Sequence, residues 1–523
     1  MASASAPTMR ELLKEGLRLR QEQGVAAAIP LFEKASQLEP NSHLPFFMLG
    51  NAISELGDLD AAVRHFVRAR DLQPREPAIR FNLGLRHLWR GYIYAAIDEL
   101  RVACRLNPDY LPAQSTYMLA LHSSDRISAE EIAAAARHWG TRFARQYQAT
   151  ERSGPDGNAA RPKQLRVGLI SGDFRRHSVA HFFLPIARAH DRDAFAYVLY
   201  STSGDHDELT EQFRSYADEW RDALPLSDDA LIQLIRADRI DVLVDLSGHT
   251  AFNRLAVFAR RAAPVQVSYL GYPDTTGLPT MDYRIADGNT DPEPLADTWH
   301  SERLLRLPGA QWCFRPFGAR TSPGPLPARN AGFVTFGSFN LLSKASDTLL
   351  RCWTEILARS QNSRLRLTRI RSPERAAEIV AMLAEAGVAP ERVDCIAEGV
   401  VAPLGSQFSG VDIALDHYPY NGVTTTCEAL YSGVPVISMH GRTSASRSGL
   451  SLLASLGLPE LVASTPKQYV ETALALAGDP TRLEQLHTSL HARFEESPLR
   501  DERRFVTHFE ELLNAAWHGM SPT

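Results

Sequence analysis

Lysine is scarce in this chain of 523 residues, in which Lys and Arg together number 56. The five lysines are Lys14, Lys34, Lys163, Lys344 and Lys467. Because arginine supplies nearly all of the positive charge, a lysine placed directly after an apolar strand is a candidate for a specific contact. The net charge of −5 gives no general reason to expect nucleic acid or a membrane surface as a partner, and we predict neither.

Cysteine is also rare, since the five cysteines lie far apart, are odd in number and form no CxxC pair. This pattern indicates neither a disulfide framework nor a zinc site, and it favours a reducing compartment. The first residues, MASASAPTMR, lack the apolar core of a signal peptide, and no apolar run approaches the ~20 residues needed to span a bilayer. We therefore expect a cytoplasmic protein.

A period of 34 residues runs through the first part of the chain, where Pro occupies positions 40, 74 and 108 and Gly occupies positions 16, 50 and 84. This period resembles the tetratricopeptide repeat, in which two antiparallel helices form a unit and Pro ends the second helix. We predict repeats over about 9–42, 43–76 and 77–110 within a helical domain at 1–150. The resulting α-solenoid has a groove that suits extended polypeptide, with a spacer or a dimerisation surface as the alternative.

The pattern changes after a polar segment rich in Gly and Pro, which we predict to be a linker at 151–164. Short apolar runs then alternate with helical stretches on both sides of a Pro-rich connector near 315–330; they are RVGLIS, YVLYS, DVLVDL, VQVSYL, VTFGSF, LRLTRI, DIALD and PVISM. Strands that alternate with helices favour parallel sheets. We predict two Rossmann-like lobes, at 165–325 and 326–523, and such lobes bind nucleotides at the carboxyl ends of their strands.

The stretch 416–438, DHYPYNGVTTTCEALYSGVPVIS, combines a turn, a helix and a strand. The helix is predicted to start between Val423 and Thr425 and to stop at Gly433. Its positive end suits a phosphate, and Glu428 is placed to accept hydrogen bonds from ribose hydroxyls. A capping box, in which Glu428 follows Thr425 at the usual spacing, explains the same residues equally well.

Several segments together resemble the protein O-GlcNAc transferases of glycosyltransferase family 41. They are DFRRHSVAH (173–181), SGHTAFNRL (247–255), RRAAPVQVSYLGYPDTTG (260–277), MDYRIAD (281–287), FGSFNLLSK (336–344), VAP (401–403), NGVTTTCEALYSGVPV (421–436) and GRTSASR (441–447). With the repeats they cover most of the chain. The resemblance implies an α + α/β protein in which a tetratricopeptide-repeat α-solenoid precedes a two-lobed GT-B glycosyltransferase.

The resemblance implies two catalytic residues. Lys344 matches the family lysine that contacts the UDP diphosphate, although residue statistics alone favour a solvated surface lysine. His177 matches the family histidine proposed as the base, a role for which a neutral imidazole is suited near pH 7. The alternatives are that a donor phosphate accepts the proton and that His177 makes a structural hydrogen bond. His181 is expected to be structural or to position substrate.

The resemblance also implies two sets of binding residues. Those expected to contact the nucleotide are Asn340, Ala402, Asn421, Gly422, Thr424, Thr425 and Glu428. Those expected to contact sugar or acceptor are His249, Gly271, Tyr272, Pro273 and Thr275. Without the family match, the loop GYPDTTG would be interpreted as a tight turn. Because no DxD string has a suitable context, we expect no metal and no other cofactor, with UDP-GlcNAc as the donor substrate.

Three positions depart from the pattern of the animal-type relatives. Val423 replaces a His, Leu341 replaces a Gln, and Leu404 stands near a missing Lys and His.

We predict an inverting, metal-independent transfer of N-acetylglucosamine from UDP-GlcNAc to Ser or Thr hydroxyls of polypeptides bound along the repeat groove. The alternatives are transfer of glucose to Asn, and a repeat scaffold whose degenerate catalytic half only senses nucleotide.

Overall fold

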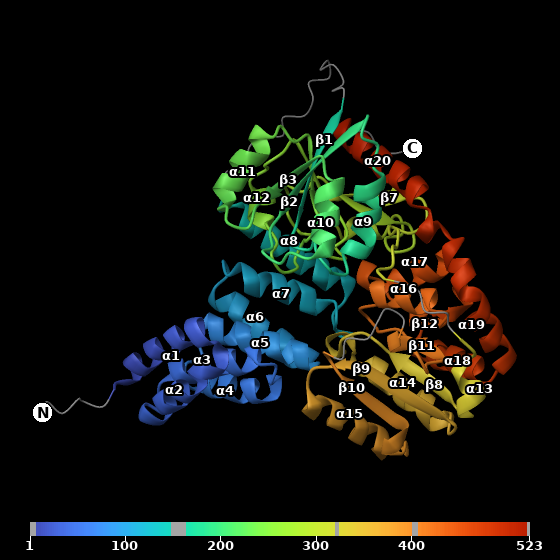
Figure 1. The fold of residues 1–523 in the computed structure, drawn as a ribbon, viewed down its shortest axis with the longest axis horizontal. Coiled ribbons are helices and arrows are strands. Elements are labelled where there is room, and N and C mark those ends of the chain that lie inside the picture. The colour runs from blue at the N-terminus through green and yellow to red at the C-terminus, as the bar shows by residue number, and fades with distance from the viewer. Residues whose placement is uncertain (1–6, 148–163, 319–323, 400–405, 520–523) are drawn as a thin grey trace, which may run out of the picture. The chain divides into compact units, whose positions relative to one another are not determined.

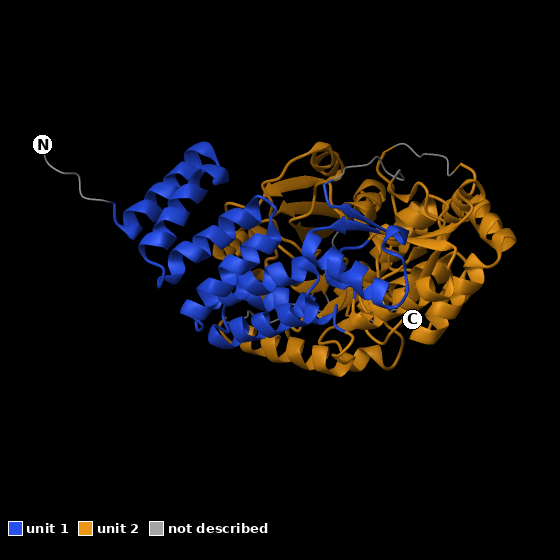
Figure 2. Ribbon diagram, turned by 90° about the horizontal axis from the view of Figure 1, so that it is seen from below, with its two compact units in different colours: residues 1–124, 340–345, 367–400 blue, residues 125–339, 346–366, 401–523 orange. Residues whose placement is uncertain are grey.

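The computed structural model describes residues 7–147, 164–318, 324–399 and 406–519 (Figure 1). Contacts divide the chain into two compact units (Figure 2). Unit 1 comprises residues 1–124, 340–345 and 367–400, and unit 2 comprises residues 125–339, 346–366 and 401–523. Within the described ranges, no helix is both long enough and apolar enough to cross a membrane.

Unit 1 begins with antiparallel helix pairs that repeat along the chain, as the 34-residue period predicts. The helices are α1 (Met9–Gln23), α2 (Val25–Leu38), α3 (His43–Glu55), α4 (Leu59–Leu72), α5 (Pro77–Arg90), α6 (Ile93–Leu106) and α7 (Leu111–Leu121). Each helix packs against the next one in sequence. The helical repeat array predicted from the sequence is therefore confirmed.

The glycines of the period allow the two helices of each pair to approach closely. A Cβ atom on Gly16 would lie 2.4 Å from the ring of Phe32, and one on Gly50 would lie 2.8 Å from the ring of Phe66. In the third pair, a Cβ atom on Gly84 would lie 2.8 Å from Cγ of Leu100. Since these bulky side chains are fully buried, a larger residue in place of the glycine would push the helices apart.

Two later segments of the chain pack with the repeats in unit 1. The 3₁₀ helix Leu342–Lys344 lies against the end of α5, where Gly91 has a φ of 88° and a Cβ atom would lie 2.9 Å from Cβ of Leu342. The buried carboxylate of Asp60 accepts hydrogen bonds from Arg90 Nε at 2.5 Å and from Ser372 Oγ at 2.6 Å. The repeats thus anchor both the Lys344 segment and the start of α15 (Pro373–Glu385).

Unit 2 contains a seven-stranded sheet in the order β3-β2-β1-β4-β5-β6-β7. The strands are β1 (Leu165–Ser171), β2 (Phe195–Ser201), β3 (Glu219–Asp222), β4 (Val242–Asp245), β5 (Val265–Ser268), β6 (Tyr283–Asp287) and β7 (Arg303–Leu307). All neighbouring strands pair in parallel. The connecting helices are α9 (Ala180–Ala189), α10 (Glu208–Tyr216), α11 (Asp228–Ala237) and α12 (Leu255–Ala259). This order reverses direction at β1, as in a doubly wound nucleotide-binding fold.

A second sheet has the order β10-β9-β8-β11-β12-β13. Its strands are β8 (Val334–Ser338), β9 (Ser363–Ile370), β10 (Val393–Ala397), β11 (Ile413–Leu415), β12 (Val436–Met439) and β13 (Val462–Ala463). The pairs β8–β11, β11–β12 and β12–β13 are parallel. The other helices of this part of the chain are α13 (Pro327–Ala331), α14 (Asp347–Arg359), α16 (Thr424–Tyr431), α17 (Ser448–Ser455), α18 (Pro466–Ala477), α19 (Pro480–Glu495) and α20 (Glu502–Trp517). Two Rossmann-like sheets after a helical array confirm the GT-B fold class.

Two helices far apart in sequence complete unit 2. The last helix, α20, returns to the first sheet, where Phe509 and Leu513 are fully buried in the same core as Val167 of β1. Helix α8 (Ala129–Ala144) also belongs to unit 2, although the sequence places it in the helical domain predicted for 1–150. The predicted domain boundaries stay predictions, because the linker at 151–164 lies almost entirely outside the described residues.

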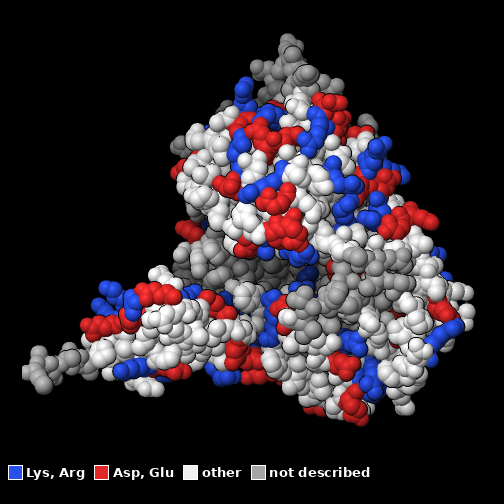
Figure 3. All heavy atoms as spheres, in the orientation of Figure 1, with Lys and Arg blue, Asp and Glu red and all other residues white. Residues whose placement is uncertain are grey.

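The charged side chains are mixed over the visible surface. On the face shown in Figure 3, acidic and basic side chains are interspersed rather than gathered by sign. Many of them pair, as in the half-buried contacts of Arg221 with Asp238 at 2.8 Å and of Arg254 with Asp228 at 2.9 Å. Such pairs on the surface contribute little to stability, but they keep both signs of charge close together.

Candidate functional site

The loop after β1 holds His177 beside a buried carboxylate. His177 Nδ1 lies 3.4 Å from Oδ2 of Asp173, four residues earlier in the chain. The Asp173 side chain is 7% exposed, whereas that of His177 is 39% exposed. The loop ends where α9 begins, and the backbone N–H of Val179 donates a hydrogen bond to the same ring nitrogen at 3.3 Å. His177 is therefore presented to solvent at the carboxyl edge of the sheet, with a carboxylate behind it.

The surroundings of His177 favour its neutral form. Burial lowers the pKa of its imidazole, an effect that the Asp173 carboxylate partly opposes. Burial also raises the pKa of Asp173. Nδ1 accepts from the Val179 amide only in the tautomer with the proton on Nε2. In the other tautomer Nδ1 carries the proton and directs it toward Asp173, and Nε2 is left with a lone pair. In this tautomer His177 is able to accept a proton from a substrate hydroxyl near pH 7.

Replacing Asp173 with Asn should move the acid limb of the pH–rate profile to lower pH. The carboxylate raises the pKa of His177, so its loss lets that pKa fall further, and the imidazole stays neutral in more acidic solution. The measurement is kcat/KM for glycosyl transfer over about pH 5 to 8, the range in which histidine titrates. Asp205→Asn is the matched control, because Asp205 is an exposed carboxylate of the same region. An unchanged acid limb would show that the Asp173 carboxylate does not set the pKa of the group that limits the rate in acid.

Unit 2 brings together two residues that the sequence places in different lobes. His181 Nε2 lies 4.0 Å from Oε1 of Glu428, whose Oε2 accepts a hydrogen bond from Gln407 Nε2 at 3.1 Å. His181 Nδ1 donates to the carbonyl of Arg315 at 2.8 Å, and burial lowers the pKa of His181 to about 4. Neutral His181 thus turns a lone pair toward the carboxylate, and a ligand hydroxyl in this position would donate to either group.

The ring of His181 has a fixed orientation. It stacks on Phe317 with a centroid distance of 3.9 Å and on Phe314 with a centroid distance of 5.2 Å. Together with the bond to Arg315, these contacts hold Nε2 toward Glu428. These contacts give His181 a structural role, and the positioning of substrate by His181 stays a prediction.

The helix after the Asn-Gly turn starts where the sequence predicts. Helix α16 runs from Thr424 to Tyr431, and its N-cap residue is Val423, whose apolar side chain has no group that caps a helix. The capping box is wrong, because Thr425 lies inside the helix and the Glu428 carboxylate accepts a hydrogen bond from Gln407. The first turn of α16 therefore depends on partners other than an N-cap side chain.

Asn421 and Gly422 shape the turn that leads into α16. The Gly422 amide donates to Oδ1 of Asp416 at 2.8 Å, and Asn421 Nδ2 donates to the carbonyl of His417 at 2.7 Å. Oδ1 of Asn421 accepts a hydrogen bond from the amide of Gly449 at 3.2 Å. Since both residues are buried, the structure gives them a role in positioning the helix, and their predicted contact with nucleotide stays a prediction.

His249 lies in the interior of unit 2. It is 1% exposed, its Nε2 is 2.9 Å from the carbonyl of Thr276, and its ring packs edge-on against Trp139 and Tyr272. Trp139 belongs to α8, so this helix is part of the wall behind the loop GYPDTTG. The observed contacts are structural, and the predicted contact of His249 with sugar or acceptor is untested.

A buried carboxylate holds the loop GYPDTTG in place. Thr275 Oγ1 donates to Oε2 of Glu302 at 2.5 Å, and the amide of Thr276 donates to Oε1 at 2.8 Å. Thr275 and Tyr272 are buried, whereas Gly271 and Pro273 are partly exposed. Of the residues in this loop that are predicted to contact substrate, Gly271 and Pro273 are the ones that remain partly exposed.

The remaining predicted residues do not lie in the described part of unit 2. Asn340 and Lys344 belong to unit 1, where Asn340 is buried and Lys344 is half-buried. Ala402 and Leu404 lie outside the described residues. The roles predicted for these residues therefore stay predictions.

The structure adds three residues that the sequence did not point to as site residues. They are Asp173 behind His177, Gln407 beside Glu428, and Glu302 beneath Thr275. Asp173 stands in the same DFRRH string as His177, so its spacing of four residues was a usable signal. Gln407 and Glu302 are 21 and 27 residues from the groups they contact, and no local pattern links them.

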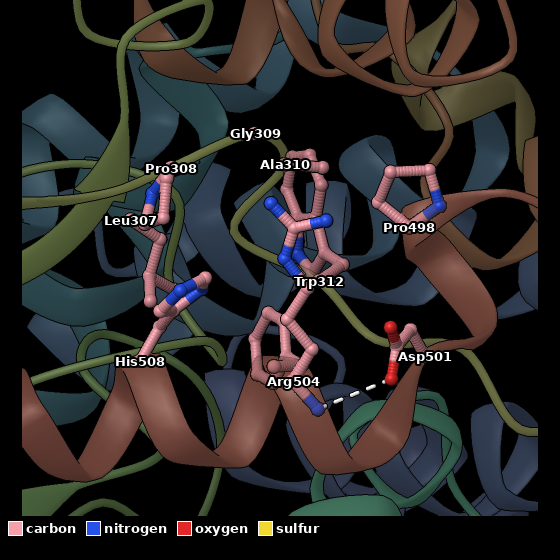
Figure 4. A pocket seen from close by; sticks show the side chains of 10 residues that line it. Leu307, Pro308, Gly309, Ala310, Trp312, Pro498, Asp501, Arg504 and His508 are labelled. Atoms are coloured by element: carbon pink, nitrogen blue, oxygen red, sulfur yellow. Dashed lines mark hydrogen bonds between the residues drawn. The ribbon is translucent and has the colours of Figure 1, made fainter.

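The question of a metal site and one cavity of the structure both bear on this region. Among the described residues, no group of three or more His, Cys, Asp or Glu side chains is arranged to hold a metal ion. A cavity of about 210 Å³ lies between the loop after β7 and α20, where Trp312 and Pro308 supply apolar wall and Arg504 and His508 supply polar groups (Figure 4). The described residues that line it include no predicted site residue, so it is a separate feature.

A family model places this architecture among known proteins. The model of glycosyl transferase family 41 matches residues 132–313 and 326–509, which include α16 and the His177 loop. The chain belongs to glycosyl transferase family 41. The match begins inside α8, in agreement with the assignment of this helix to unit 2.

Family relatives occur among plant and bacterial proteins. The chain is 37% identical over 420 residues to the probable UDP-N-acetylglucosamine--peptide N-acetylglucosaminyltransferase SPINDLY of Petunia hybrida, and 27% identical over 446 residues to the corresponding enzyme SEC of Arabidopsis thaliana. These alignments cover 79% and 82% of this chain. The chain spans 45% of the length of both relatives.

A solved bacterial structure matches nearly the whole chain. It is a mutant of the O-GlcNAc transferase of Thermobaculum terrenum, with a TM-score of 0.88, 34% identity and coverage of 99% of both chains. The helical array and the two sheets therefore occur together in the same order in a protein named for O-GlcNAc transfer.

Proposed function

We propose that this chain is an inverting glycosyltransferase that transfers N-acetylglucosamine from UDP-GlcNAc to Ser or Thr hydroxyls of polypeptides. The observation that carries the proposal is the likeness to the Thermobaculum terrenum O-GlcNAc transferase over 99% of both chains. The names of the plant relatives, which include a UDP-GlcNAc donor and a peptide acceptor, support the same donor and acceptor here. Membership of family 41 supports a glycosyltransferase.

In this proposal His177 is the base that accepts the proton of the attacking hydroxyl. Its neutral form, its partial exposure and the carboxylate at Nδ1 support this role. Transfer with inversion is a single displacement, in which the hydroxyl oxygen bonds to the anomeric carbon as the bond to UDP breaks. The proton passes to His177 Nε2, and the diphosphate leaves as UDP.

The leaving UDP requires stabilisation of its negative charge. We assign this role to Lys344 and to the first turn of α16 at Thr424 and Thr425, because a cation and a helix N-terminus both favour an oxyanion. Glu428 is assigned to the ribose hydroxyls, which are able to donate to its carboxylate or to the lone pair of His181 Nε2. No step in this scheme uses a metal ion.

The repeats and the cellular setting complete the proposal. We assign polypeptide acceptors to the groove of the repeat array, because stacked helical repeats offer extended binding surfaces. A cytosolic location fits the cysteine pattern, since all five cysteines are free thiols in the structure.

The proposed donor and the metal-free mechanism are tested together by calorimetric titration of the full chain with UDP, UDP-GlcNAc, UDP-glucose and GDP in EDTA. We expect UDP and UDP-GlcNAc to bind, GDP not to bind, and transfer to polypeptide to be unchanged when EDTA replaces Mg²⁺. Loss of transfer in EDTA with recovery in Mg²⁺ would overturn the metal-free mechanism. Failure of all uridine nucleotides to bind would favour a scaffold, and preference for UDP-glucose would favour a glucosyltransferase.

A further inference from the structure

Phe252 has an unusual backbone conformation and an exposed ring. It lies in the loop after β4, its φ is 60°, and the residue is 51% exposed. A positive φ is strained for a residue with a bulky side chain, and strain of this kind collects at functional sites. Exposure of a large aromatic ring brings no burial of apolar surface that would offset this strain.

The loop is held in this conformation by neighbouring residues. The carbonyl of Phe252 accepts a hydrogen bond from Thr202 Oγ1 at 2.9 Å. Phe252 Cβ lies so close to Gly172 that a Cβ atom on the glycine would be 2.6 Å away. Gly172 must therefore lack a side chain for Phe252 to rest on it.

Phe252 makes no contribution to the apolar core around it. Within the described residues, the core cluster of the first sheet includes Phe174 and Phe183 but not Phe252. Phe252 therefore lies over Gly172 with about half of the surface of the residue open to solvent. A smaller residue would satisfy the same backbone bond to Thr202.

Phe252 lies at the carboxyl edge of the first sheet, next to the loop that carries His177, where the acceptor is expected to bind. Gly172 directly precedes Asp173, the carboxylate that faces His177, so Phe252 covers the first residue of the loop that carries the proposed base. Strands β1 and β4 are neighbours in the sheet, and their carboxyl ends form the edge at which ligands of such folds bind. The nucleotide is assigned to the other lobe at α16, which leaves the acceptor as the partner for this edge.

We propose that Phe252 binds an apolar side chain of the polypeptide acceptor next to the hydroxyl that is modified. The proposal rests on the proposed transfer to polypeptides and deepens it, because it gives the acceptor a preferred neighbour. An aliphatic or proline side chain that covers the ring would bury the apolar surface now exposed. Phe252 is thus a specificity residue and takes no part in proton transfer.

The test uses the full chain and two pools of synthetic peptides with one central Ser, flanked by Val and Leu in one pool and by Ser and Gly in the other. Wild type should prefer the apolar pool, and Phe252→Gly should raise KM for that pool about tenfold and abolish the preference. The unfolding temperature of Phe252→Gly should be unchanged or higher, because glycine adopts a positive φ without strain. Hydrolysis of UDP-GlcNAc without acceptor should be unchanged.

Arg239→Gly is the matched control, because Arg239 is an exposed residue with a φ of 54° that lies between α11 and β4. It should share any rise in unfolding temperature but keep the wild-type preference. Retention of the preference by Phe252→Gly, a lower unfolding temperature, or a change in donor hydrolysis would overturn the inference. If wild type modified neither pool while UDP-GlcNAc hydrolysis persisted, the proposed polypeptide acceptor would fail, and the inference with it.

Discussion

Replacing Gly140 with Ala should destabilise unit 2 by more than about 3 kcal/mol and abolish transfer. Gly140 lies in α8, and a Cβ atom there would be 1.8 Å from the carbonyl oxygen and 2.3 Å from the carbonyl carbon of Gly277. These are backbone atoms, which cannot rotate away as a side chain does. Gly277 is itself confined, since its own Cβ position lies 2.1 Å from the carbonyl oxygen of Ala136 and its φ is 79°.

The clash would propagate into the loop GYPDTTG, which ends at Gly277. Separation of α8 from this loop would also remove Trp139 from the ring of His249, whose centroid lies 4.6 Å away. The measurements are the unfolding temperature of the full chain and the rate of glycosyl transfer. Gly288→Ala is the matched control, because no atom lies within 4 Å of a Cβ at Gly288. Equal stability of the two variants would show that α8 is able to move away from the loop.

The role of α8 shows one limit of reasoning from the sequence. Its apolar residues recur with the helical period, and this period is the same whether a helix stacks on repeats or covers a sheet. The sequence therefore predicts the helix but assigns it to the domain at 1–150, whereas contacts place it in unit 2. The glycine that marks its true partner, Gly140, packs on a loop more than a hundred residues later.

The strands that the sequence missed were missed for two physical reasons. The central strands β1, β4, β5, β8 and β11 are apolar runs and were predicted from the sequence. At the sheet edges, β3 (EWRD) is half-exposed and charged, and β10 (VDCIA) is mostly exposed. Edge strands need apolar residues on few positions, so their sequences resemble loops. Strand β6 is buried, but Arg284 interrupts its apolar run and donates to the carbonyl of Tyr272 at 3.0 Å.

The parts of the candidate site that are formed by residues close together in the sequence were predictable. The spacing of His177 and Asp173, and the start of α16 at Thr424, follow from a few neighbouring residues. The approach of His181 to Glu428 depends on how two segments 247 positions apart fold together, and no local pattern contains that information. Family resemblance supplied the roles, and the structure supplied the groups that hold each residue in place.

Replacing Lys344 with Ala should reduce transfer by about 10²–10³-fold or more, which corresponds to roughly 3–4 kcal/mol of transition-state stabilisation. The side chain is proposed to neutralise the charge that develops on the diphosphate as the bond to the sugar breaks. The fold should be unaffected, because Lys344 is half-buried and the anchor of its segment is Leu342, which packs on Gly91 at the end of α5. Unfolding temperature and UDP affinity are measured beside the transfer rate.

Lys467→Ala is the matched control, because Lys467 is an exposed lysine in the first turn of α18. The change in kcat distinguishes the possible roles of Lys344. A large fall in kcat with similar affinity for UDP-GlcNAc would mean that the lysine acts mainly in the transition state, whereas an equal loss of affinity and kcat/KM would mean that it binds the ground state as well. Wild-type activity in Lys344→Ala would remove this residue from the mechanism and leave the first turn of α16 to stabilise the leaving group alone.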